Sequence, residues 1–154
     1  MDTTHPAEIE QSMRLTQIIA AAIMASIVIY MVIAVVVRPT TPPPDAERLQ
    51  TLAMAFLVLS VGSLLAARVI FQSRLRAARD GDTPMERLQR YRIAVVLAFA
   101  LRETVAIYGL VLSLATGDPR WILGFGLVAL VTMAMGWPRR SSMLELADTV
   151  QPIG

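Results

Sequence analysis

The chain contains no cysteine and no lysine, and its single histidine, His5, stands in a polar N-terminal stretch. The absence of cysteine excludes disulfides, thiolate nucleophiles and cysteine metal sites. The absence of lysine excludes amine nucleophiles and Schiff-base chemistry, because all 14 basic residues are arginine. We therefore predict no catalytic residue, no metal site and no cofactor.

Charge is also missing from long stretches of the sequence. Hydrophobic residues make up 55% of the chain and charged residues 17%, which is more apolar than an ordinary soluble domain. Each of the four apolar runs, at 15–37, 49–71, 91–115 and 121–138, has about 18 to 25 residues, enough for a helix to cross roughly 30 Å of hydrocarbon. The sequence predicts an all-α integral membrane protein, in which four transmembrane helices form an antiparallel bundle. A single domain would cover 1–154, with 139–154 as a short cytoplasmic tail.

A soluble four-helix bundle is the main alternative fold. Each of its helices would carry a polar stripe, whereas residues 18–30 are apolar on every side. The first run is also longer than the apolar core of a signal peptide, so we expect it to remain as the first span.

Arginines gather between the second and third apolar runs. Six of them lie there or at the very start of the third run: Arg74, Arg76, Arg79, Arg87, Arg90 and Arg92. The positive-inside rule places this loop and both termini in the cytoplasm, and we expect a bacterial inner membrane. The six arginines are expected to contact anionic lipid headgroups and not nucleic acid.

Two further patterns locate helix ends. Trp121 and Trp137 flank the fourth run, where interfacial aromatic anchors are common. Thr83 and Pro84 suit the N-cap and the first position of a helix. We therefore predict that the third helix begins near Pro84 and continues to about Leu114.

Arg102 and Glu103 interrupt the third run near its middle. A charge at that depth costs about 2.5 to 3.5 kcal/mol on insertion scales, so both side chains are expected to face protein or water. Adjacent residues of a helix point about 100° apart, which disfavours an ion pair between the two. Arg68, near the cytoplasmic edge of the second run, is a candidate partner for Glu103.

Small residues recur on one face of the third run. They are spaced three and four apart and share that face with Arg102: Ala94, Ala98, Ala106, Gly109 and Ser113. Membrane helices approach closely where such residues line up. This face is therefore predicted to contact other helices, within the bundle or between copies.

The sequence Glu103-Thr-Val-Ala-Ile-Tyr-Gly-Leu-Val-Leu-Ser-Leu114 resembles the carboxylate-bearing helix of the c subunit (proteolipid) of F-type ATP synthases. In that family a carboxylate at mid-helix is commonly followed by Ala-Ile-Tyr-Gly-Leu-Val. The family's helical hairpin assembles into a ring, and its carboxylate binds and releases a proton or a sodium ion. The resemblance implies that Glu103 binds an ion. Arg102 departs from the family pattern, which has an apolar or small residue there, and two extra runs flank the hairpin.

Two functions remain open on these patterns. The first is a non-enzymatic accessory or scaffold subunit that packs with itself or with another membrane protein and uses Arg102 and Glu103 as internal polar contacts. The second is a proteolipid that moves protons or sodium ions through Glu103. An intramembrane enzyme fits less well, because the apolar runs contain neither a general base for a nucleophile nor a metal-ligand set.

Overall fold

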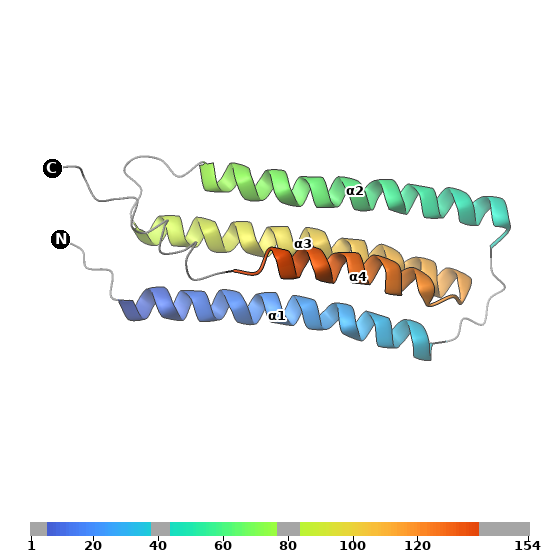
Figure 1. Ribbon diagram of the computed structural model, residues 1–154, viewed down its shortest axis with the longest axis horizontal. Helices are drawn as coiled ribbons and strands as arrows, with labels where there is room; N and C mark the ends of the chain where they lie inside the picture. The colour runs from blue at the N-terminus through green and yellow to red at the C-terminus, as the bar shows by residue number, and fades with distance from the viewer. Residues whose placement is uncertain (1–5, 38–43, 77–83, 139–154) are drawn as a thin grey trace.

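The computed structural model describes residues 6–37, 44–76 and 84–138. These residues form four helices: α1 (Pro6–Val36), α2 (Ala46–Arg76), α3 (Pro84–Thr116) and α4 (Arg120–Met135). Consecutive helices run in opposite directions, so the start of α3 lies at the same end of the bundle as the start of α1 (Figure 1). The prediction of an all-helical fold with four helices is confirmed for this part of the chain.

Three of the helices are long and apolar enough to cross a membrane. Their apolar segments are Glu10–Val36, Ala46–Ser73 and Gln89–Thr116. The helices extend beyond the predicted runs because polar turns continue them at their ends. α3 begins at Pro84, as predicted, and its N-cap candidate Thr83 lies outside the described residues.

The fourth helix is shorter than the other three. α4 has 16 residues, or about 24 Å at the helical rise of 1.5 Å per residue, whereas the hydrocarbon core is roughly 30 Å thick. It ends at Met135 because Pro138 disfavours helical backbone at Trp137, the residue before it, and lacks an N–H to continue the helix. α4 is therefore a short apolar helix followed by three non-helical residues, 136–138, and a crossing over 121–138 stays a prediction.

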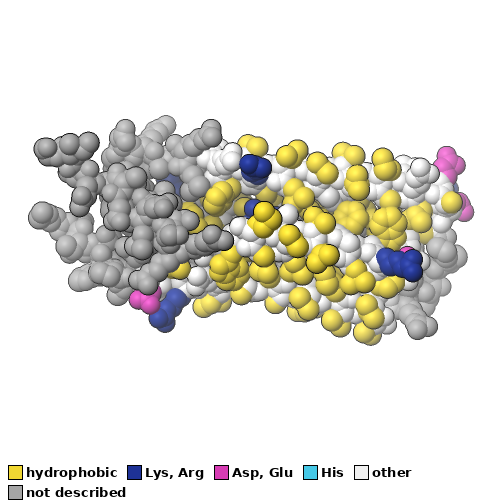
Figure 2. Space-filling view, in the orientation of Figure 1, with side chains coloured by type: hydrophobic (Ala, Val, Ile, Leu, Met, Phe, Trp, Pro, Cys, Tyr) yellow, Lys and Arg dark blue, Asp and Glu magenta, His cyan; other side chains and the backbone are white. Residues whose placement is uncertain are grey.

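α3 occupies the centre of the bundle and contacts each of the other three helices, while α1 also contacts α4. Accordingly 39% of the most apolar stretch of α3 is buried, against 17% for α1 and 11% for α2. Its buried residues include Tyr91, Val95, Phe99 and Val105. Hydrophobic side chains cover most of the visible face, and the acidic ones lie near its two ends (Figure 2).

Candidate functional site

The carboxylate of Glu103 faces α1. Glu103 Oε1 accepts a hydrogen bond of 2.5 Å from Ser26 Oγ and one of 2.9 Å from Tyr30 Oη. Ser26 and Tyr30 are four residues apart, so both hydroxyls project from the same face of α1. These three residues, which we call the Glu103 cluster, join α1 to α3 through polar contacts.

The Ser26 hydroxyl has two acceptors within reach. Ser26 Oγ lies 2.7 Å from the carbonyl oxygen of Ile23 as well as 2.5 Å from Glu103 Oε1. A serine hydroxyl has one proton, and a carbonyl oxygen can only accept. A protonated Glu103 would donate to Ser26 Oγ and leave the serine proton for Ile23, whereas an ionised Glu103 would compete with Ile23 for it. The cluster is therefore compatible with either protonation state of Glu103.

Arg102 points to a different neighbour, the C-terminal end of α4. Its guanidinium lies 5.7 Å from the centroid of the Phe99 ring and packs against Gly136, the C-cap of α4. The C-terminal end of a helix carries partial negative charge on its last carbonyls, which favours a cation there. The contact with Phe99 adds a cation–π interaction. Because α4 stops early, its end reaches the level of Arg102.

The structure does not bring the predicted charged partners together. Among the described residues, no ion pair joins Glu103 to Arg102 or to Arg68. Arg68 is exposed on α2, and Glu103 takes its contacts from the hydroxyls of α1 instead. The predicted polar contact of Arg68 with Glu103 is therefore replaced by Ser26 and Tyr30.

The small residues predicted to form the contact face of α3 are buried. Ala94, Ala98 and Ala106 are at most 2% exposed, as is Ser113. Gly109 allows α4 to approach closely, because a Cβ at this position would lie 2.6 Å from Phe125 Cβ and 3.0 Å from the carbonyl oxygen of Trp121. The face serves contacts within the chain.

Ser113 also caps the N-terminal end of α4. Its hydroxyl accepts a 2.9 Å hydrogen bond from the backbone N–H of Ile122, one of the N–H groups at a helix start that have no partner within the helix. Pro119, at the N-cap position, provides no side-chain cap. A serine of α3 therefore caps α4 from across the turn at Gly117, whose positive φ of 72° suits glycine.

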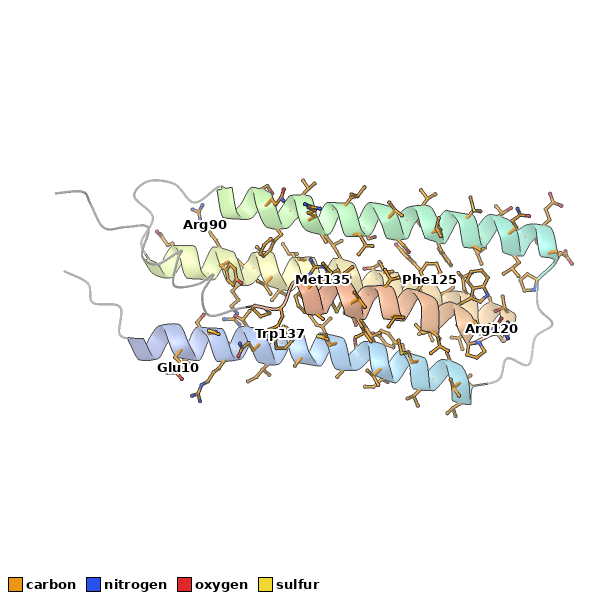
Figure 3. The ribbon with its side chains drawn as sticks, viewed as in Figure 1. Glu10, Arg90, Arg120, Phe125, Met135 and Trp137 are labelled. Carbon is orange, nitrogen blue, oxygen red and sulfur yellow. The ribbon has the colours of Figure 1, made fainter. Side chains whose placement is uncertain are left out.

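The predicted headgroup arginines and tryptophan anchors are only partly described. Arg74, Arg76 and Arg87 lie in helices, but their side chains are outside the described set, as is the whole of Arg79. Arg90 and Arg92 are half-buried near the start of α3. Trp121 lies near the start of α4 and Trp137 just past its end, where Trp137 packs on the hydrophobic core (Figure 3).

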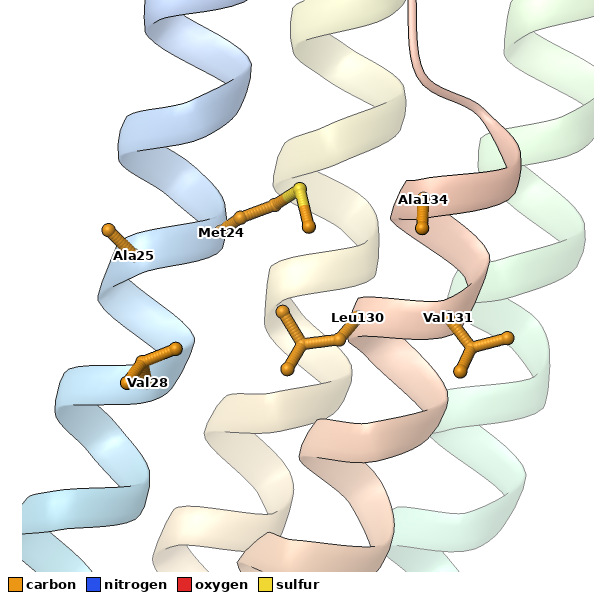
Figure 4. Close-up of a pocket in the computed structure, with 6 residues that line it drawn as sticks. All are labelled: Met24, Ala25, Val28, Leu130, Val131 and Ala134. Carbon is orange, nitrogen blue, oxygen red and sulfur yellow. The ribbon is translucent and has the colours of Figure 1, made fainter.

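Two grooves flank α4. One, of about 470 Å³, lies between α1 and α4 and is lined only by apolar residues, among them Met24 and Leu130 (Figure 4). The other, of about 420 Å³, lies between α2 and α4 and has Arg120 in its lining. No cluster of three or more His, Cys, Asp or Glu side chains that could hold a metal occurs in the described part of the chain.

Sequence reasoning missed two features of this site. One is the pair of hydroxyls at Ser26 and Tyr30 on α1, neither of which the sequence analysis singles out. The signal in the sequence is a pair of hydroxyl-bearing residues spaced four apart on an apolar helix. In lipid, such hydroxyls bond either to a backbone carbonyl of their own helix or to a polar group on a neighbouring helix. The role of Ser113 as a cap for α4 had no sequence signal, since it depends on the turn between the helices.

A comparison of the chain with protein-family models, curated proteins and solved structures finds no match. The resemblance to the proteolipid helix therefore rests on Glu103–Leu114 alone.

Proposed function

We propose that the protein is a multi-pass protein of the bacterial inner membrane, with both termini in the cytoplasm, that acts as a non-enzymatic accessory or scaffold subunit. The observation that carries this proposal is the Glu103 cluster. A carboxylate near the middle of α3 is held by two hydroxyls of the same chain, which is how an internal polar contact between membrane helices is built. The six predicted headgroup arginines support the orientation.

The exposed surface supports a role in packing with other membrane proteins or with further copies. Most of α1 and α2 is apolar and exposed, and on α1 the exposed residues include Ala21, Ala22 and Ala25. Small residues permit close helix contact in lipid. The second partner is the bilayer itself, with its anionic headgroups at the arginine-rich end.

Self-packing can be tested with single cysteines because the chain has none of its own. We expect Ala22→Cys, on the exposed face of α1, to form a disulfide-linked dimer when membranes are oxidised. Ala20→Cys is the matched control, since Ala20 is only 1% exposed, and it should remain monomeric. A monomeric mass in mild detergent, together with no cross-link at Ala22 and no stoichiometric membrane partner, would contradict the scaffold proposal.

The second candidate function is proton or sodium translocation through Glu103, as the proteolipid resemblance implies. The observation in its favour is the shared hydroxyl of Ser26, because the cluster accommodates a protonated Glu103. The two candidates differ in their response to N,N′-dicyclohexylcarbodiimide, which modifies protonated carboxyl groups in membranes. We expect Glu103 of the scaffold to resist the reagent. Rapid labelling that sodium or high pH suppresses, with a cation flux in proteoliposomes that Glu103→Gln abolishes, would establish translocation instead.

A further inference from the structure

The groove between α2 and α4 combines an apolar lining with one charged group. Leu57, Val61 and Leu64 of α2 line one side, while Gly124 and Val128 of α4 line the other. Ser60 also lines the groove, but its hydroxyl donates to the carbonyl oxygen of Phe56 within its own helix, at 2.7 Å. Among the described residues of the lining, Arg120 is thus the only charged one.

At Gly124 the α4 wall of the groove has no side chain. This glycine is exposed, and a Cβ built on it would meet nothing within 4 Å. A larger side chain there would extend into the groove without disturbing the packing of the four helices. Gly124 is therefore a position at which the groove can be filled selectively.

Arg120 lies at the end of the bundle where α4 begins (Figure 3). Its side chain is exposed, and it forms no ion pair within the described residues. The neighbouring carboxylate of Asp118 accepts the backbone N–H of Arg120, at 3.0 Å, and not its guanidinium. Trp121, which also lines the groove, is a predicted interfacial residue, so Arg120 lies at the depth of phospholipid phosphates.

The size of the groove excludes a protein helix as its occupant. A helix about 10 Å across has a cross-section of about 80 Å², so a volume of about 420 Å³ accommodates about one turn of a helix. An acyl chain is much thinner and matches the apolar walls. A phosphate at the headgroup end matches the charge of Arg120.

We propose that the α2–α4 groove binds an anionic phospholipid, whose acyl chain lies against Val61 and Gly124 and whose phosphate pairs with Arg120. The proposal rests on the membrane residence of the protein, but it does not depend on the scaffold role or on Glu103.

Trp121 provides a local reporter for the acyl chain. The chain has two tryptophans, so Trp137→Phe leaves Trp121 as the only tryptophan. Lipids with brominated acyl chains quench tryptophan on contact. In phosphatidylcholine vesicles that contain a small mole fraction of brominated lipid, we expect brominated phosphatidylglycerol to associate with the site about fivefold more strongly than brominated phosphatidylcholine, since one arginine near the membrane surface contributes about 1 kcal/mol toward an anionic lipid.

Three further variants are compared in the Trp137→Phe background. Arg120→Gln should remove the preference for phosphatidylglycerol. Gly124→Leu should lower quenching by both lipids. Gly62→Leu is the matched control, because Gly62 is also exposed with nothing within 4 Å and is not part of the groove lining. It should leave quenching unchanged.

Equal quenching by the two lipids with Arg120 present, or unchanged quenching in Gly124→Leu, would overturn the proposal. Vesicles made entirely of brominated phosphatidylcholine test membrane residence separately, since an inserted protein must be quenched there whatever the groove binds. Should Trp137→Phe not fold, native mass spectrometry of the wild-type protein and Arg120→Gln in mixed lipids replaces the optical assay. The wild type is then expected to retain phosphatidylglycerol preferentially, and equal retention by the two proteins would contradict the site.

Discussion

At the scale of single residues, Arg102 and Glu103 are adjacent in the sequence, but their side chains contact different helices. Glu103 is held by the hydroxyls of Ser26 and Tyr30 on α1, whereas Arg102 lies over Phe99 and against the end of α4. The turn of about 100° per helical residue separates the two directions. Glu103 contacts polar groups of α1 and Arg102 contacts the end of α4, so each residue fixes a different helix onto α3.

Glu103→Ala is expected to destabilise the protein by roughly 1 to 2 kcal/mol, because it removes two interhelical hydrogen bonds that are worth about 0.6 kcal/mol each in membrane proteins. Glu103→Gln should lower the free energy of unfolding by less, since its amide oxygen can still accept hydrogen bonds from both hydroxyls. The measurement is the free energy of unfolding in mixed micelles. A double-mutant cycle between Tyr30→Phe and Glu103→Ala should show coupling. If the stability losses of the two single mutants simply add in the double mutant, the hydrogen bond between Tyr30 and Glu103 does not contribute to the free energy of unfolding.

Ser113→Ala is expected to cost about 1 to 3 kcal/mol, because it leaves the buried N–H of Ile122 without its acceptor. Thr116→Ser is a control on the same helix, since its hydroxyl can still donate to the carbonyl oxygen of Leu112. Hydrogen exchange at Ile122 gives a local readout, and it should accelerate in Ser113→Ala alone. Unchanged exchange there would show that another group caps α4.

At the scale of elements, the contact between α3 and α4 depends on the absence of side chains. Gly109 brings α3 against Trp121, Ile122 and Phe125, and Gly126 does the same for α4 against Ile27 and Met31 of α1. Close backbone approach through small residues is the usual basis of helix association in lipid. The short helix α4 is therefore positioned by two glycines that face different partners.

Gly109→Ala is expected to destabilise the protein by about 1 to 3 kcal/mol, the usual cost of overpacking, because a Cβ would approach the backbone carbonyl of Trp121 to 3.0 Å. Gly124→Ala is the matched control on α4, since nothing lies within 4 Å of its Cβ position, and it should cause no loss. Thermal unfolding in detergent compares the two variants. Equal effects would show that helix propensity, and not close packing, determines the outcome.

At the scale of the whole molecule, the long apolar helices α1 and α2 and the short helix α4 pack against a central α3, which is the third long apolar helix. The outer faces of α1 and α2 expose many large apolar side chains, such as Ile18, Val36 and Leu65. Exposed apolar area of this extent requires a bilayer or another protein around it. The side chains at either end of α1 therefore report directly on whether the helix crosses a membrane.

Single cysteines at Glu10, near the start of α1, and Arg48, near the start of α2, test this topology, because both positions are exposed and the two helix starts lie at opposite ends of the bundle (Figure 1). A membrane-impermeant maleimide added to intact cells should label Arg48→Cys and spare Glu10→Cys until the membrane is permeabilised. Labelling of both positions in intact cells would contradict a crossing by α1. Labelling of Glu10→Cys alone would reverse the orientation derived from the arginines.

The positions of the apolar runs and the helix start at Pro84 could be read from the amino-acid sequence, because the length of an apolar run and the chemistry of a helix start are local properties. The small-residue face of α3 was also recognisable, since helical periodicity alone brings Ala94, Ala98 and Ala106 to one side.

Only the tertiary structure decided which groups meet the charges of α3. The rotation and axial position of α1 bring Ser26 and Tyr30 to Glu103, and the early end of α4 brings Gly136 to Arg102. The groove at Gly124 likewise depends on how far α2 and α4 stand apart on α3. These contacts join residues from different helices, and the relative placement of helices follows from the packing of all four at once, which no single segment of sequence encodes.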